Sequence, residues 1–140
     1  MATFNKYQCF VENVAEKVHN LGSDVLKVAL TNTAPAATDT VWNTTVYPAP
    51  VAANGYTAGG NTPSITSSSQ TSGTYKLVLA DTVFTATSGG IGPFRYVVLY
   101  NSTASGAVIG YYDYGSSITL ADTETFTIDF DLSNGVLTLA

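Results

Sequence analysis

The sequence predicts a mainly β protein, an antiparallel β-sandwich or jelly-roll-like domain with one N-terminal α-helix. Three observations support this prediction. Short runs rich in β-branched and aromatic residues recur at close spacing after residue 24, and turn-forming residues separate them. Only the N-terminal segment has an apolar pattern with the period of a helix. The length of 140 residues corresponds to one domain, residues 1–140.

The one predicted helix covers residues 5–21. Its apolar residues recur at a spacing of three and four, which places them on one face. They are Tyr7, Phe10, Val11, Val14, Val18 and Leu21. Asn5 begins a pattern that resembles a capping box, and Gly22 suits the end of a helix. The apolar face either packs on the protein's own sheet or docks on a neighbouring subunit, with Phe10 and Val14 in the contact.

Residues 24–30 are predicted to form the first strand, and residues 75–140 supply the other strands of the sandwich. Within the second region, strands are predicted at residues 75–79, 82–86, 95–100, 107–113, 125–130 and 136–139. Turns are predicted at residues 80–81, 88–90, 105–106, 114–116 and 133–135. Asn134-Gly135 is the best candidate for a hairpin turn, because type I′ turns need positive φ at both central residues.

Residues 31–74 form a long irregular excursion between these two regions. It is rich in proline, glycine, serine and threonine, which disfavour a central strand. Only a short strand around residues 64–68 and a helical turn near residues 39–42 are expected to interrupt it. A connection of this length is usually mobile or functional. Its aromatic residues could serve a protein interface, the protein's own core or sugar stacking. They are Trp42, Tyr47 and Tyr56.

The composition excludes several classes of protein. Only 11% of the residues are charged, against about 25% in an ordinary soluble domain, and 21 Thr and 12 Ser take their place. With 45% hydrophobic residues, the chain does not have the composition of a disordered protein. The net charge of -5 would repel a phosphate backbone, so nucleic acid is not an expected partner. A surface rich in threonine loses less on desolvation than one rich in Lys and Glu, which is consistent with a subunit of an assembly.

The beginning of the chain lacks the basic and apolar regions of a signal peptide. No apolar run approaches the roughly 18 residues that span a bilayer. We therefore expect synthesis in a cytoplasm and no association with a membrane.

No residue pattern indicates catalysis. An enzyme needs groups that titrate near neutrality or a nucleophile beside a base. The one histidine, His19, is expected in the last turn of the helix, where the helix dipole favours a cation. The one cysteine, Cys9, is expected as a small buried side chain on the helix. The acidic residues near the C-terminus match no calcium-loop spacing. We expect no enzymatic activity, no cofactor and no bound metal.

Arg95 is the one arginine of the chain and begins a predicted strand. Two interpretations are open for it. It pairs with a carboxylate of the same chain, such as Asp81 or Asp129, or it anchors a contact between subunits.

The run Asn54-Gly55-Tyr56-Thr57-Ala58-Gly59-Gly60 resembles a pattern common in small virion proteins of tailed bacteriophages. The most specific part is Gly-Tyr-Thr-x-Gly-Gly, residues 55–60. The similarity covers roughly residues 24–140, and its further matching segments are residues 81–85, 95–101, 112–115 and 125–128. The chain departs from the pattern at Phe84, where tryptophan is frequent, and at Pro63.

The resemblance implies a structural component of a phage particle, without catalytic residues. The expected role is a capsid decoration, or cement, protein on the outside of the head, made in the host cytoplasm. Its expected partners are the major capsid protein and copies of itself, in a homo-oligomer. The candidate interface residues are Phe10, Val14, Trp42, Tyr47, Tyr56 and Arg95. A tail, neck or fibre-attachment protein is the alternative. A carbohydrate-binding module that uses Trp42, Tyr56 and Tyr112 is an alternative from another class.

Overall fold

The computed structural model describes residues 2–140, which form a mainly β, sandwich-like fold with antiparallel sheets and one short helix, as predicted. The strands are β1 (Phe4–Lys6), β2 (Leu26–Thr31), β3 (Ile65–Thr71), β4 (Thr74–Leu79), β5 (Thr82–Thr85), β6 (Ile91–Asn101), β7 (Ala107–Leu120), β8 (Thr125–Ile128) and β9 (Leu137–Leu139). The helix is α1 (Cys9–Ala15). No helix within residues 2–140 is long and apolar enough to cross a membrane.

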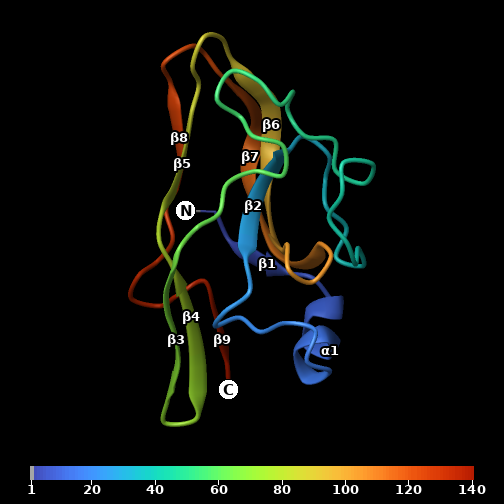
Figure 1. Cartoon of the computed structure of the whole chain (residues 1–140), viewed down its shortest axis with the longest axis vertical. Helices are drawn as coiled ribbons and strands as arrows, with labels where there is room; N and C mark the ends of the chain where they lie inside the picture. Colours follow the sequence, from blue (N-terminus) through green and yellow to red (C-terminus); the bar gives the residue numbers. More distant parts are fainter. Residues whose placement is uncertain (1) are drawn as a thin grey trace.

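The strands form two layers (Figure 1): β5 and β8 stand opposite the first layer, and β3, β4 and β9 continue the second layer below it, across from α1. The first layer is a four-stranded sheet in the order β1-β7-β6-β2. The second layer contains the three-stranded sheet β3-β4-β9 and the two-stranded sheet β5-β8. The main core lies between the layers and includes Val28, Leu30, Val97, Leu99, Leu77, Leu79, Phe84 and Ile128. Burial of these apolar side chains is the main favourable contribution to folding.

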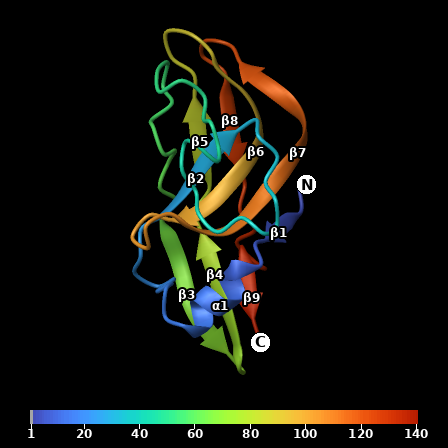
Figure 2. The same ribbon diagram turned by 90° about the vertical axis from the view of Figure 1, so that its right-hand side faces the viewer.

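Residues 32–64 are here called the outer loop, and the part of it that carries Trp42 and Tyr47 covers the other face of the first layer (Figure 2). A second buried cluster lies there, made of Tyr7, Ala29, Tyr47, Val98, Tyr100 and Val108, with Trp42 packed against it. The first layer is therefore buried on both faces. A strand covered on both faces has an almost continuous apolar sequence rather than an alternating one. This explains why Leu26–Thr31 is buried at nearly every position.

The Gly-Tyr-Thr-x-Gly-Gly motif closes one side of the sandwich, between β2 and β5. Asn61, directly after the motif, exchanges two backbone hydrogen bonds with Val28, of 2.9 and 3.0 Å. Its side-chain Nδ2 donates to the Val83 carbonyl at 3.0 Å. The Tyr56 hydroxyl accepts a bond from the backbone of β2 at 3.1 Å. A Cβ on Gly60 would lie 1.9 Å from the Val28 carbonyl oxygen, so only glycine permits this approach.

The helix is shorter than the predicted segment of residues 5–21. Phe4–Lys6 form β1 instead, because their backbone groups pair with the edge of β7. The helix ends at Ala15, and Lys17 has a left-handed backbone with φ 65°. Leu21 fits the helical spacing but packs on the main core from the loop that follows. The apolar residues assigned to one predicted helix therefore come from the helix, from its flanks next to β1 and from the loop that follows it.

The strands predicted at residues 75–79, 82–86, 95–100, 107–113 and 24–30 are confirmed in position, although β6 and β7 are longer than expected. The predicted strand at residues 64–68 is β3. β7 continues through the predicted turn at residues 114–116, where Gly115 has φ 100°. No helical turn forms near residues 39–42; Val41 instead makes an isolated antiparallel bridge to Ala107.

The predicted hairpin at Asn134-Gly135 is wrong, because the flanking strands β8 and β9 belong to different sheets. The two-residue hairpin of this fold is Ser72-Gly73, which joins β3 to β4. Both residues have positive φ, of 52° and 86°, as a type I′ turn requires. Serine followed by glycine is a weaker turn signal than asparagine followed by glycine, so the sequence favoured the wrong position.

Candidate functional site

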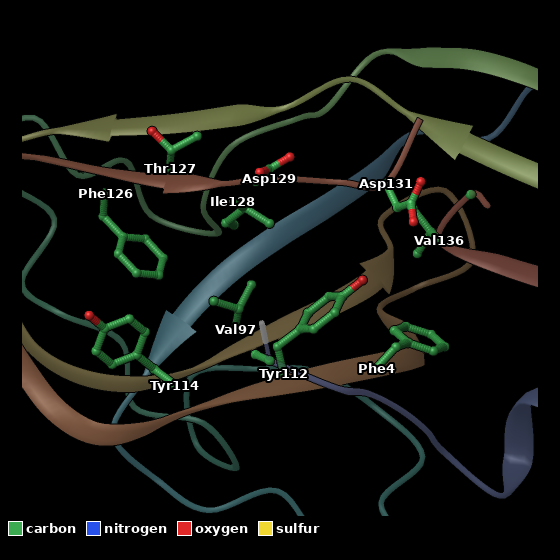
Figure 3. Close-up of a pocket in the computed structure, with 12 residues that line it drawn as sticks. Phe4, Val97, Tyr112, Tyr114, Phe126, Thr127, Ile128, Asp129, Asp131 and Val136 are labelled. Carbon is green, nitrogen blue, oxygen red and sulfur yellow. The ribbon is translucent and has the colours of Figure 1, made fainter. Parts of the chain in front are cut away.

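The side of the sandwich opposite the Gly-Tyr-Thr-x-Gly-Gly motif is open. It holds a groove of about 380 Å³ between β1 and β7 of the first layer and β8 of the second (Figure 3). We call it the open-edge groove and define it by its main lining residues, Phe4, Tyr112, Tyr114, Phe126, Ile128 and Asp129. Its volume lies within the usual range of ligand-binding clefts.

The strand period of two residues places the apolar side chains in this groove. Tyr112 and Tyr114 lie two positions apart on β7, and Phe126 and Ile128 lie two positions apart on β8. The register pairs Phe4 with Tyr112, whose rings have centroids 5.5 Å apart. The rings of Tyr114 and Phe126 meet edge to face across the groove, with centroids 5.8 Å apart. The groove therefore has an aromatic floor and walls from both layers.

The polar groups of the groove are few and distinct. Asp131 accepts hydrogen bonds from the backbone of Ser133 and Asn134, both at 2.8 Å, and from the Asn134 side chain. These bonds hold the pKa of Asp131 below its usual value. Asp129 is exposed and has no hydrogen-bond or ion-pair partner among residues 2–140. Burial raises the pKa of Tyr112 to about 12, so its hydroxyl is neutral at physiological pH.

Three predicted interface residues lie in the protein's own core, and this corrects their expected role. Phe10 is 1% exposed, Tyr47 is 0% exposed and Tyr56 is 3% exposed. The outer loop and α1 pack on the sheets and use these aromatic rings as their own anchors. A side chain that is buried within its own chain has no surface left for a partner.

Val14 and Trp42 are half-buried, at separate places. Val14 packs against the main core from α1. Trp42 stacks on Tyr100, with ring centroids 4.3 Å apart and planes at 9°. The Tyr100 hydroxyl in turn donates to the Gly59 carbonyl at 2.7 Å. Trp42 therefore ties the outer loop to the first layer.

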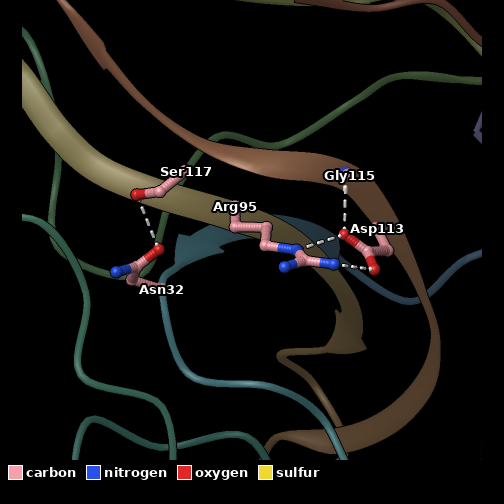
Figure 4. Close-up of polar contacts among 5 residues, drawn as sticks. All are labelled: Asn32, Arg95, Asp113, Gly115 and Ser117. Atoms are coloured by element: carbon pink, nitrogen blue, oxygen red, sulfur yellow. Dashed lines mark hydrogen bonds and ion pairs between the residues drawn. The ribbon is translucent and has the colours of Figure 1, made fainter.

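Arg95 pairs with a carboxylate of its own chain, as one of the two interpretations predicted, but the partner is Asp113 on the neighbouring strand β7 and not Asp81 or Asp129 (Figure 4). Its Nε donates to Oδ1 at 2.8 Å and its Nη2 donates to Oδ2 at 2.9 Å. Adjacent strands bring these side chains together, whereas Asp81 accepts a bond from the Phe130 backbone elsewhere. The Arg95 guanidinium and the Gly115 N–H hold the pKa of Asp113 below its usual value.

The structure does not bring the three expected sugar-stacking residues together. Tyr56 is buried in the main core. Trp42 packs on the outer face of the first layer, whereas Tyr112 packs on the inner face. A stacking platform needs exposed rings on one surface. These three rings do not share a surface.

His19 lies in a polar cluster after the helix, and not in its last turn as expected. It is 8% exposed, and its Nδ1 lies 3.0 Å from the Asn101 side-chain Nδ2. The same Nδ2 donates to Asp24 at 2.6 Å. Burial lowers the pKa of His19, so the ring is neutral at pH 7. This cluster ties the loop after α1 to the end of β6.

The structure brings together no catalytic or metal-binding constellation that we recognise in the part of the chain it describes. No group of three or more His, Cys, Asp or Glu side chains in residues 2–140 is placed to hold a metal ion. Cys9 is half-buried, with its sulfur facing the Asp39 and Val108 carbonyls, and burial raises the pKa of its thiol. A thiol with a raised pKa is a poor nucleophile.

Comparison of the chain with models of protein families, with curated proteins and with solved structures found no match. The fold and the site together define a β-sandwich with one closed side and one open apolar side. Sequence reasoning placed Phe126 and Ile128 on one face of a strand but missed the groove. Two period-two patterns in the sequence indicate the groove: Tyr112 with Tyr114, and Phe126 with Ile128. They lie in separate segments, so the sequence alone does not show that they face each other.

Proposed function

We propose that this protein is a structural subunit of a bacteriophage virion, and specifically a capsid decoration protein that binds the outside of the assembled shell. Its partners are the major capsid protein and copies of itself. A protein that binds only the assembled shell stabilises the shell by mass action. A place in the tail, at the neck or at a fibre attachment is the alternative.

The open-edge groove is the observation that carries a role in protein contact. Exposed apolar surface bordered by polar residues is typical of protein interaction sites. Tyr114, on the groove, is 53% exposed. Large exposed apolar side chains are costly in water, so a partner that covers them gains binding free energy. The groove thus supports a binding role, and the resemblance of residues 54–60 supports a virion as its place.

The charge of the chain supports the outside of the shell over its inside. The net charge of -5 is unfavourable beside packaged DNA. The acidic side chains Asp129 and Asp131 lie at the groove itself. A coat surface that offers basic side chains would complement them.

The direct test is to locate the protein in imaged particles of the phage whose genome encodes it, with an antibody against the purified chain. Label on the head is the expected result, and label on the tail alone would favour the alternative. Quantitative mass spectrometry of purified particles adds the copy number. A decoration protein is present in hundreds of copies, whereas a tail fitting is present in few. Particles that contain none of the protein would exclude both.

A matched pair of variants tests whether the groove makes the contact. Tyr114 and Val83 are similarly exposed, at 53% and 48%, on strands of the two layers, but only Tyr114 lines the groove. Tyr114→Lys should abolish binding to particles that lack the protein, whereas Val83→Lys should bind like the wild type. Circular dichroism checks that both variants are folded. Equal binding by both variants would remove the groove from the proposal.

A further inference from the structure

We infer that the open-edge groove receives an extended segment of the partner protein, which adds a strand to the free edge of β8 and pairs a basic side chain with Asp129. The inference rests on the proposed function only for the identity of the partner, the coat protein. Strand addition to an exposed sheet edge is a common mode of peptide recognition, in which backbone hydrogen bonds supply much of the affinity. Three features of the groove point to this mode.

The first feature is the unpaired edge of β8. Within residues 2–140, this strand pairs only with β5, and its other edge faces the groove. The bond at the end of the β5–β8 pair shows which residues bond across it: the Ala86 N–H donates to the Glu124 carbonyl at 2.9 Å. In an antiparallel pair, hydrogen-bonded positions alternate, so Phe126 and Ile128 continue the bonds to β5. The N–H and C=O groups of the residues that alternate with Phe126 and Ile128 point away from β5. Those residues are Thr125, Thr127 and Asp129.

The second feature is the match between that edge and the apolar floor. Thr127, Ile128 and Asp129 all line the groove, so a strand that pairs with them lies along it. Every second side chain of such a strand would point toward the rings of Tyr112 and Phe126 (Figure 3). These positions call for apolar residues in the partner. The Tyr112 hydroxyl has no hydrogen-bond partner within residues 2–140 and is free to bond to the added strand.

The third feature is charge. Asp131 is engaged by Ser133 and Asn134, whereas Asp129 is exposed at the rim without a partner in residues 2–140. Asp129 is therefore available to pair with a basic side chain of the partner. An Arg or Lys beside the apolar positions fits, and an acidic segment would be repelled. The occupant is thus an extended segment with alternating apolar residues and a basic residue.

The probe is a short synthetic peptide of alternating Val and Thr with one Lys, titrated into the full chain by calorimetry. Two control peptides share its length: one has Glu in place of Lys, and one carries N-methyl groups on alternate amides and so cannot form a ladder. The Lys peptide should bind at least about tenfold more tightly than the Glu peptide. The N-methylated peptide should not bind. Equal binding of the N-methylated peptide, or no binding of any peptide at millimolar concentration, would overturn the inference.

Two variants at one position provide the matched control within the protein. Thr127→Pro removes a backbone N–H that points away from β5, and proline is tolerated at such edge positions. Thr127→Val changes the side chain but keeps the N–H. Thr127→Pro should lose the peptide, whereas Thr127→Val keeps the edge N–H and should still bind it, although its affinity can shift because the side chain lines the groove. Unchanged peptide binding by folded Thr127→Pro contradicts strand addition.

Hydrogen exchange supplies a readout that does not depend on a variant. In the wild-type chain, the Lys peptide should slow exchange at the amides of Thr125, Thr127 and Asp129, and exchange at Val83 should not change. Failure of this result leaves the location on the virion untouched, because the protein would then bind the shell in another way. Strand addition without any location on the virion would instead retain the groove and reject the proposed function.

Discussion

The hydroxyl groups of Tyr7 and Tyr47 share a hydrogen bond of 3.0 Å inside the protein, although the two residues are 40 positions apart in the sequence. Both side chains are fully buried. The Tyr47 hydroxyl also donates to the Asp39 carboxylate. This chain of contacts fixes the outer loop on the first layer, and burial raises the pKa of both tyrosines. The loop is therefore a third layer of the fold.

The variant Tyr47→Phe should destabilise the protein by about 1–3 kcal/mol, because it leaves the buried Tyr7 hydroxyl without its partner. Tyr111→Phe is the control: it removes a hydroxyl whose side chain is only half-buried, and it should cost less. Urea denaturation measures the free energy of unfolding of both variants. An equal loss for the two variants would contradict a specific role for the Tyr7–Tyr47 bond.

Gly60→Ala should reduce the free energy of unfolding by about 3 kcal/mol or more, since φ is +80° and a Cβ would meet the Val28 carbonyl oxygen at 1.9 Å. Gly73→Ala has a similar φ of +86° but nothing within 4 Å of the added Cβ. It should cost about 1 kcal/mol from backbone strain alone. Thermal denaturation of both variants separates the clash from the strain. If both variants lose the same free energy of unfolding, the close approach of Gly60 to Val28 does not contribute to stability beyond backbone strain.

The free energy of unfolding should fall as the pH is lowered from 7 to 5, in part because of His19. Burial lowers the pKa of His19 in the folded protein below the ordinary value of 6.5. As the pH falls below 6.5, His19 therefore binds a proton in the unfolded chain before it does so in the folded protein, and this favours unfolding. Protonation would also break the contact of Nδ1 with the Asn101 amide. His19→Gln should reduce this slope. Urea denaturation at several pH values measures it, and an unchanged slope in His19→Gln would rule out the contribution.

Asp113→Asn should weaken the stability of the protein slightly, and the difference from the wild type should vanish in strong acid. Arg95, and then the Gly115 N–H, hold the pKa of the Asp113 carboxyl below 3.8 in the folded protein. Its contribution is therefore present above that pH and is lost as the pH falls through the folded pKa. High salt should also reduce the difference, because both side chains are partly exposed. Melting curves with and without salt measure both effects.

The β-sandwich and most of its strands could be predicted from the sequence because they follow local patterns. Phe126 and Ile128 alternate with threonines, and the run from Val97 to Tyr100 has a high β-propensity. The helix could not be bounded in this way. Its apolar spacing continued to Leu21, but the edge of β7 captured residues 4–6 and the chain left the helix at Lys17. Pairing with β7 decided where the helix starts, and the left-handed backbone at Lys17 decided where it ends.

The open-edge groove could not be predicted because it depends on which two strand edges face each other. Phe4, Tyr114 and Phe126 are far apart in the sequence, and nothing local records that β1 and β8 lie on the same side. The loop aromatics misled for a related reason. Tyr47 and Tyr56 lie in a segment rich in proline and glycine, which favours an exposed loop, yet Tyr47 is buried on the outer face of the first layer and Tyr56 in the main core between the layers.

The three-layer arrangement gives the scarcity of charge a second meaning. In an ordinary sandwich, each strand offers every second position to water, and charged residues occupy many of those positions. Here the outer loop removes that option from most of β2 and from the second half of β6, where Ala29, Val98 and Tyr100 face the loop instead. A chain of 140 residues that covers its central sheet twice has fewer places left for Lys and Glu. Part of the low charge content therefore follows from the burial of both faces of the first layer.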